Sequence, residues 1–137
     1  MRLRKGALMI VLAVAVGMAT ASLQAHHSVA NFWQADKVVS VTGVVTKVLL
    51  VNPHPTIFLD VTEGGQTVKY VAILGQSVSG LAGFGITKDS FVFGSKVVLE
   101  GHPPKAEGST TKGILVNALT LPDGKRIALG EAGLGLR

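Results

Sequence analysis

The stretch from residue 38 to residue 62, VVSVTGVVTKVLLVNPHPTIFLDVT, constrains the fold of this chain more than any other. Its first half is rich in β-branched residues and predicts a long strand. The Asn52-Pro53-His54-Pro55 corner must end that strand, because neither proline can donate a ladder hydrogen bond and each restricts the residue before it. The alternation of inward-facing and outward-facing residues that is typical of a strand then resumes from Thr56. The stretch therefore predicts two strands joined at a sharp corner, with His54 as its one possible chemical group.

The two faces of the long strand predict how it is covered. One face is expected to be buried along the whole strand, and its members are Val39, Val41, Val45, Leu49 and Val51. The other face begins polar and turns apolar at Val48 and Leu50, which predicts that the second half is covered on both sides. Gly43 is expected to supply a bend, since glycine inside a strand often marks a barrel corner or a bulge.

The rest of the chain predicts a small barrel. Further strands are expected over residues 67–74, 96–101, 114–121 and 126–129. Between the third and fourth strands, residues 76–86 predict a short helix that Ser77 caps and Gly85 ends, followed by a turn with Phe91 or Phe93 pointing inward. This order is typical of the OB-fold. The fold class is therefore mainly β: a five- to six-stranded OB-like Greek-key barrel with one short helix between strands 3 and 4.

Residues 1–25 are predicted to be a secretory signal peptide rather than part of the fold. Arg2, Arg4 and Lys5 precede an apolar run shorter than the roughly 20 residues that span a bilayer. An uncleaved membrane anchor is the alternative. The remaining chain divides into an arm at 26–37, the barrel at 38–129 and a flexible tail at 130–137, and Phe32 and Trp33 are expected to anchor the arm. Export predicts a periplasmic or secreted protein with no membrane span after cleavage.

Composition excludes several functions. Three of the 13 basic residues and none of the 8 acidic ones lie in the signal, so the mature chain carries 10 against 8, a net charge of +2. Thinly spread Lys and Arg with few aromatic residues argue against nucleic-acid binding. The chain has no cysteine, which excludes thiol catalysis and disulfides. Without a nucleophile motif, a phosphate-binding loop or a recognisable carboxylate pair, an enzyme is not expected.

Several short motifs together carry a family resemblance. They are Ala25-His26-His27-Ser28, the strand at 41–45, Val51-Asn52-Pro53-His54, the Thr87-x-Asp89-Ser90 turn and Gly101-His102-Pro103. As a set they resemble an uncharacterised family of small exported bacterial proteins, classed as a domain of unknown function. The resemblance covers nearly the whole mature chain. It implies export and a small β-barrel, and it brings no established activity, cofactor or catalytic residue.

The four histidines of the chain all fall within these motifs, and they are the candidate metal ligands: His26, His27, His54 and His102. Imidazole is a common ligand of copper, zinc and nickel. Cleavage after Ala25 would leave the amino group of His26 beside its own imidazole, and His54 or His102 could complete a nitrogen-rich Cu(II) site. Cleavage before Ala25 would instead give Ala-His-His, whose amine, backbone nitrogens and His27 imidazole favour a square-planar copper or nickel site. Alternatively, these histidines are surface or hydrogen-bonding residues that bind no metal in the cell.

The predicted function is therefore an exported, non-enzymatic binding or accessory module for a small ligand or another envelope protein. The main alternative is a Cu(II)-binding protein that uses His26 with His54 or His102. A hydrolytic or redox enzyme is the third hypothesis. The sequence leaves the oligomeric state open, although an exposed edge strand would allow strand-pairing dimers.

Overall fold

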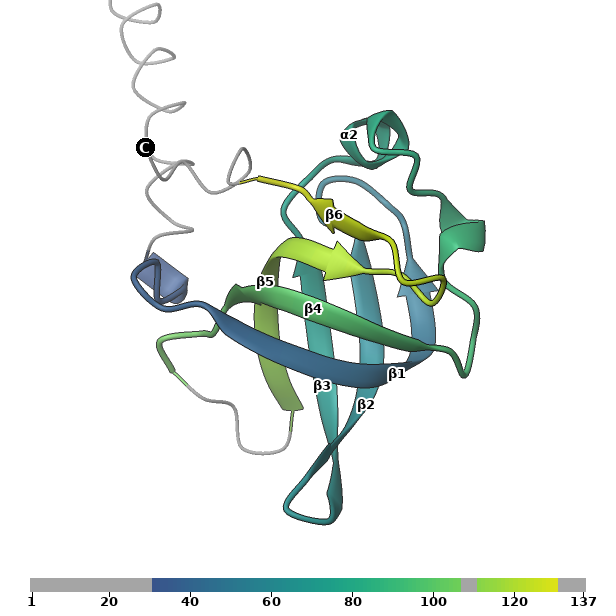
Figure 1. The fold of residues 1–137 in the computed structure, drawn as a ribbon. Coiled ribbons are helices and arrows are strands. Elements are labelled where there is room, and N and C mark those ends of the chain that lie inside the picture. Colours follow the sequence, from purple (N-terminus) through teal and green to yellow (C-terminus); the bar gives the residue numbers. More distant parts are fainter. Residues whose placement is uncertain (1–30, 107–110, 131–137) are drawn as a thin grey trace, which may run out of the picture.

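The structure is a computed structural model that describes residues 31–106 and 111–130. Figure 1 shows its elements, whose bounds are β1 (Val39–Leu49), β2 (Thr56–Glu63), β3 (Gln66–Leu74), α2 (Val78–Gly83), the 3-10 helix η1 (Lys88–Ser90), β4 (Lys96–His102), β5 (Thr111–Thr120) and β6 (Arg126–Ala128). Each predicted strand and the helix occur close to their expected positions. The predicted signal peptide, His26, His27 and residues 131–137 of the predicted tail lie outside the described residues.

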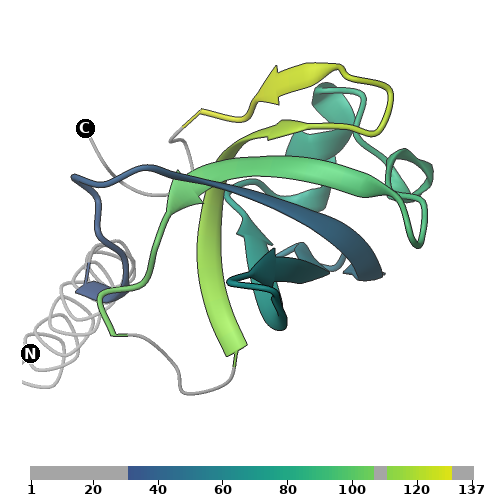
Figure 2. The same ribbon diagram turned by 60° about the horizontal axis from the view of Figure 1, so that its bottom comes forward.

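The strands close into a barrel. Neighbouring strands follow the order β3-β2-β1-β4-β5-β6, and β3 also pairs with β5 in parallel. That second pairing joins the two ends of the series, so five strands form a closed barrel and β6 continues the sheet beside β5. Figure 2 shows the strands curving around a common interior. The prediction of a mainly β, OB-like Greek-key barrel with one short helix is confirmed.

The core is built from the inward-facing residues of all the barrel strands. Ile57, Leu59 and Val61 of β2 alternate inward as predicted, and the helix adds Leu81. Ser77 caps this helix by accepting a hydrogen bond from the Gly80 backbone N–H at 3.1 Å. After the helix, Phe91 is buried whereas Phe93 is 77% exposed, so Phe91 is the aromatic residue of that turn that points inward.

A β-bulge in β1 reverses which face is buried. Val41 and Val45 are buried as predicted, but the register with β2 shifts between Val45 and Lys47. One extra residue in β1 exchanges the inward-facing and outward-facing positions of the residues that follow, because side chains alternate with a period of two. Leu49 is therefore 37% exposed and Val51 59% exposed. The predictions that Leu49 and Val51 lie on the buried face, and that the second half is covered on both sides, are wrong.

Gly43 serves close packing, whereas the irregularity of β1 lies three residues further along the chain. Gly43 keeps its register opposite Val97 of β4. A Cβ atom at Gly43 would lie 2.9 Å from Val61 Cγ2 and 3.1 Å from the Asp60 carbonyl oxygen. Any side chain would therefore push β1 away from β2. Close packing of β1 on β2 therefore gives a steric reason for the glycine at this position, and the bend predicted at Gly43 stays a prediction.

The arm before β1 lies against the segment that follows β4. The Gln34 N–H donates to the Pro103 carbonyl at 2.9 Å, and the Lys105 N–H donates to the Phe32 carbonyl at 2.8 Å. Trp33 is half-buried over Gly113, whereas Phe32 is 67% exposed. Of the two predicted anchors, only Trp33 is therefore packed on the barrel. Within residues 31–106 and 111–130, no helix has the length and hydropathy to cross a bilayer.

Candidate functional site

A cavity of about 710 Å³ lies between the arm, the corner after β1 and the end of β3. Its lining residues come from five separate parts of the chain: Asn31, Phe32 and Trp33; Pro53 and His54; Ile73, Leu74, Gly75, Gln76 and Ser77; Pro104, Lys105 and Ala106; and Leu115. No local pattern in the sequence could have predicted it, since the barrel alone brings these segments together.

The wall formed by the arm is held by side-chain as well as backbone hydrogen bonds. The Gln34 Nε2 amide donates to the Pro104 carbonyl at 2.8 Å, beside the bridge between Trp33 and Pro104. Gly113 permits this contact, because a Cβ atom there would lie only 3.3 Å from the Trp33 ring. Trp33 and Pro104 are therefore fixed on one side of the cavity.

The corner that carries His54 is held by three hydrogen bonds. The Leu74 N–H donates to the Pro55 carbonyl at 2.8 Å, and the Val78 N–H at the start of α2 donates to Asn52 Oδ1 at 2.9 Å. The Thr56 hydroxyl donates to the His54 carbonyl at 2.8 Å. Pro55 itself is buried, while the His54 side chain is exposed at the cavity. The role of Asn52 could not be predicted from its neighbours, because its partner lies 26 residues away.

The lining is largely apolar, with a few polar side chains. Two of these serve the structure, since Gln76 Nε2 donates to the Leu129 carbonyl at 2.8 Å and the Ser77 hydroxyl caps α2. Asn31, His54 and Lys105 are the other polar residues of the lining. A volume of a few hundred Å³, apolar walls and a small set of polar groups are typical of sites for small molecules. The lining of this cavity therefore has the character of a small-molecule site.

His102 lies in a different environment from His54. The residue is 1% exposed, and its Nδ1 atom lies 2.9 Å from the Lys37 carbonyl oxygen and 3.2 Å from that of Gln34. Because carbonyl oxygens only accept, Nδ1 must carry the proton and donate to them. His102 thus ties the arm to β4, and it is not among the residues that line the cavity with His54.

The predicted metal ligands are not gathered into one cluster in the part of the chain that the structure describes. Among those residues, no three His, Cys, Asp or Glu side chains lie close enough together to hold a metal ion. His54 is exposed at the cavity, His102 is buried beneath the arm, and His26 and His27 lie outside the described residues. A metal site that includes His102 would use its Nε2 atom, because Nδ1 faces the carbonyls of Lys37 and Gln34.

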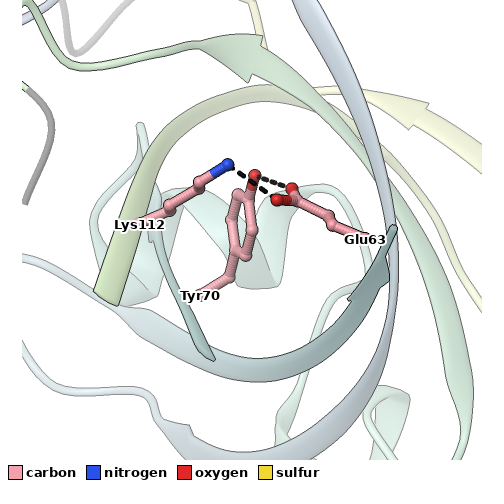
Figure 3. A network of polar contacts seen from close by, with 3 residues as sticks. All are labelled: Glu63, Tyr70 and Lys112. Carbon is pink, nitrogen blue, oxygen red and sulfur yellow. Dashed lines mark hydrogen bonds and ion pairs between the residues drawn. The ribbon is translucent and has the colours of Figure 1, made fainter. Parts of the chain in front are cut away.

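A second, smaller hollow of about 410 Å³ contains a polar network at the opening of the barrel. The Tyr70 hydroxyl donates to Glu63 Oε1 at 2.6 Å, and the Lys112 ammonium donates to Glu63 Oε2 at 2.6 Å. Figure 3 shows these three side chains pointing toward one another inside the ring of strands. Hydrogen bonds from Lys112 and from Tyr70 lower the pKa of the Glu63 carboxyl. The network links β2, β3 and β5 where the barrel closes.

Comparison with known proteins places the chain beside proteins whose role is not established. The family model described as a family of unknown function (DUF6152) matches residues 13–114. The match includes the arm, the corner and the strands from β1 to β4. A comparison with curated proteins finds no match.

Proposed function

Because the chain belongs to DUF6152, a family of unknown function, we propose its function from the cavity: it is an exported, non-enzymatic module that binds a small ligand between the arm, the corner and β3. The observation that carries this proposal is the cavity of about 710 Å³, with its apolar lining and few polar groups. Sites of this size and character bury most of a small ligand.

The position of the cavity on the barrel supports the same proposal by analogy. OB-folds bind their ligands on the face of strands 2 and 3, between the loop that joins strands 1 and 2 and the loop that joins strands 4 and 5. Here the corner between β1 and β2 supplies His54, β3 supplies Ile73, and the segment after β4 supplies Lys105. The analogy concerns the place of binding, and the ligand must be argued from the lining residues.

Two features of the structure favour binding over catalysis. Among the described lining residues, Ser77 is the one with a side-chain hydroxyl group, and this hydroxyl is engaged as the cap of α2. The Glu63 carboxylate accepts hydrogen bonds from both Tyr70 and Lys112 across the closure of the barrel.

The basic and apolar pattern of residues 1–25 supports export to the periplasm or beyond it.

Substituting one wall residue tests the proposal. Ile73→Ser removes an apolar side chain from the lining, and we expect it to weaken binding of the neutral dye Nile red by about tenfold. Val71→Ser is the matched control, because Val71 is also half-buried on the outer face of β3 but does not line the cavity. A fluorescence titration measures both. Equal losses in the two variants, or no dye binding by the native protein, would contradict the proposal.

A Cu(II)-binding protein is the second candidate, and the placement of His54 favours it. His54 is exposed at the cavity that Asn31 and Phe32 also line, and those two residues follow His26 and His27 closely in the chain. A chelate formed by the amino group and imidazole of His26 would need one further imidazole, from His54 or from Nε2 of His102.

Calorimetric titration with Cu(II) tests this second candidate. The native protein should bind more tightly than an unfolded peptide that contains adjacent histidines, and His26→Ala and His54→Ala should each weaken that binding. Sequencing the amino terminus of the exported protein checks that His26 is the first residue. An affinity equal to that of the peptide would rule out the copper site.

A further inference from the structure

We infer that the ligand of the cavity is an amphipathic anion, with an apolar body and one carboxylate or phosphate head group that lies beside Lys105 and His54. This inference rests on the proposed function, because it names the chemical class of the ligand for the same cavity. It is carried by two properties of the described lining residues, namely the sign of their charge and the contrast between buried apolar and exposed basic side chains.

The charged groups of the lining all favour an anion. Lys105 is the one positively charged residue among the described lining residues, and His54 adds an imidazole whose N–H can donate to an anion; none of the described lining residues is acidic. Three acidic side chains are paired elsewhere, Asp60 with Lys69, Glu63 with Lys112 and Glu100 with Arg126. Asp36 of the arm does not line the cavity either. Among the described lining residues, a cationic ligand thus meets a like charge and no opposite one, whereas an anion gains an opposite charge.

The lining residues differ in burial, and this difference favours a ligand with an apolar part and a charged part. Leu74 and Leu115 are 1% and 4% exposed and supply buried apolar surface to the lining. His54 and Lys105 are both exposed, and we call them the rim of the cavity. An apolar body gains most against the buried residues, and a charged head group loses least of its hydration beside the exposed ones. The lining therefore suits a molecule that is apolar in one part and negative in another.

The backbone fixes the position of the basic rim. The Lys105 N–H donates to the Phe32 carbonyl at 2.8 Å, which holds the start of this side chain beside the arm. The His54 carbonyl accepts from the Thr56 hydroxyl at 2.8 Å, which holds the corner. Both basic side chains thus start from anchored backbone, so a head group would meet them without first ordering a loop.

The cavity contains its own fluorescent reporter. Trp33 is the single tryptophan of the chain, and its half-buried ring forms part of the wall. A ligand that displaces water from this ring should change the intensity and emission maximum of the intrinsic fluorescence. Occupancy can therefore be measured on the unlabelled, full chain.

A series of ligands with one apolar chain and different head groups tests the inference. We would titrate the purified protein with laurate, dodecyl phosphate, dodecanol and dodecyltrimethylammonium below their aggregation limits, and follow Trp33 fluorescence. The two anions should bind about fivefold or more tightly than dodecanol, and the cation most weakly. The order of laurate and dodecyl phosphate identifies which head group the rim prefers.

Charge-neutralising variants assign the effect to the rim. Lys105→Met keeps the aliphatic stem and should remove most of the preference for laurate and dodecyl phosphate over dodecanol, because the positive charge is lost. Lys125→Met is the matched control, because it removes one positive charge from an exposed turn outside the cavity. Equal binding of dodecanol and laurate, or an equal loss in both variants, would overturn the inference while leaving the cavity as a binding site. If none of the four compounds binds, the proposed function fails as well.

Discussion

At the scale of single residues, glycine positions show where two backbones must meet. Gly101 lies in β4 next to an irregularity of register with β5, opposite Val116. A Cβ atom built there would collide with the Leu115 carbonyl oxygen and would lie 2.9 Å from Val116 Cα. Both are backbone atoms of a paired strand, which cannot move aside as a flexible side chain can. Gly101 is therefore required by the packing of β4 on β5.

We expect Gly101→Ala to lower the free energy of unfolding by about 3 kcal/mol, because β4 and β5 must separate to admit the methyl group. Urea unfolding followed by circular dichroism measures this loss. Gly83→Ala is the control, since a Cβ atom at that position of α2 meets nothing within 4 Å. That variant should be neutral or slightly more stable, because alanine favours the helix. A Gly101→Ala protein as stable as the Gly83→Ala protein would contradict this reading of the close contact.

At the scale of elements, the parallel pairing of β3 with β5 is the step that closes the barrel. Tyr70 is opposite Lys112 in that pairing, and Glu63 at the end of β2 bonds to both side chains. A carboxylate between a phenol and an ammonium group thus links three strands at the closure. Sequence reasoning did not predict the network, because Glu63 and Lys112 are 49 residues apart.

The network predicts a pH dependence of stability. Lys112 and Tyr70 lower the pKa of Glu63 below its ordinary value of 4.5, so the folded protein holds this proton less tightly than the unfolded chain does. The stabilisation is complete above about pH 4.5 and is lost as the pH falls through the folded pKa. Solvent reaches these side chains, which limits the effect to about 1 kcal/mol or less.

Urea midpoints measured from neutral to acidic pH check this expectation. Glu63→Gln should lower the midpoint at neutral pH, and the difference from the native protein should disappear in acid. Some pH dependence should remain in the variant, because Arg126 also lowers the pKa of Glu100. A constant difference at every pH would mean that the charge of Glu63 has no part in the closure.

At the scale of the whole molecule, the cavity exists only while the arm is docked on the barrel. His102 is central to that docking, because its Nδ1–H lies beside the carbonyls of Lys37 and Gln34 in a buried position. The histidine is thus explained by the structure as the link between arm and barrel. Its role connects the stability of the arm to the shape of the proposed binding site.

We expect His102→Leu to loosen the arm while the barrel stays folded, because the Lys37 and Gln34 carbonyls lose the hydrogen bond that joins them to β4. Trypsin should then cut after the exposed Lys37 severalfold faster, as followed by mass spectrometry, and Nile red binding should weaken. His102→Asn is the matched variant, since its amide can donate from a position close to that of Nδ1. It should retain most of the protection. Equal cleavage rates in the leucine variant and the native protein would show that His102 does not hold the arm.

Much of the fold could be predicted because its causes are local. The alternation of Ile57, Leu59 and Val61, the prolines of the corner, and the cap at Ser77 each depend on neighbouring residues alone. The OB-like order followed from these elements. The buried face of β1 could not be predicted beyond Val45, because a bulge depends on how β1 meets β2 rather than on either strand by itself.

The candidate site was predicted only in part. The sequence singled out His54 as the one possible chemical group of the corner, and the structure places it in the lining of the cavity. His102 looked equivalent from its place beside prolines, yet it is buried with its Nδ1–H on the arm. The difference arises from which segment covers each strand end, and a local pattern carries no information about that.

The sequence by itself therefore determined the strands, the corner, the helix and the order that makes an OB-like barrel, because hydrophobic periodicity and turn chemistry act between near neighbours. Only the tertiary structure decided which residues of β1 face the core after the bulge, the network at the closure and the cavity beneath the arm. Each of these depends on contacts between segments far apart in the chain, such as Phe32 with Lys105 and Glu63 with Lys112. Such contacts come into being when the barrel closes.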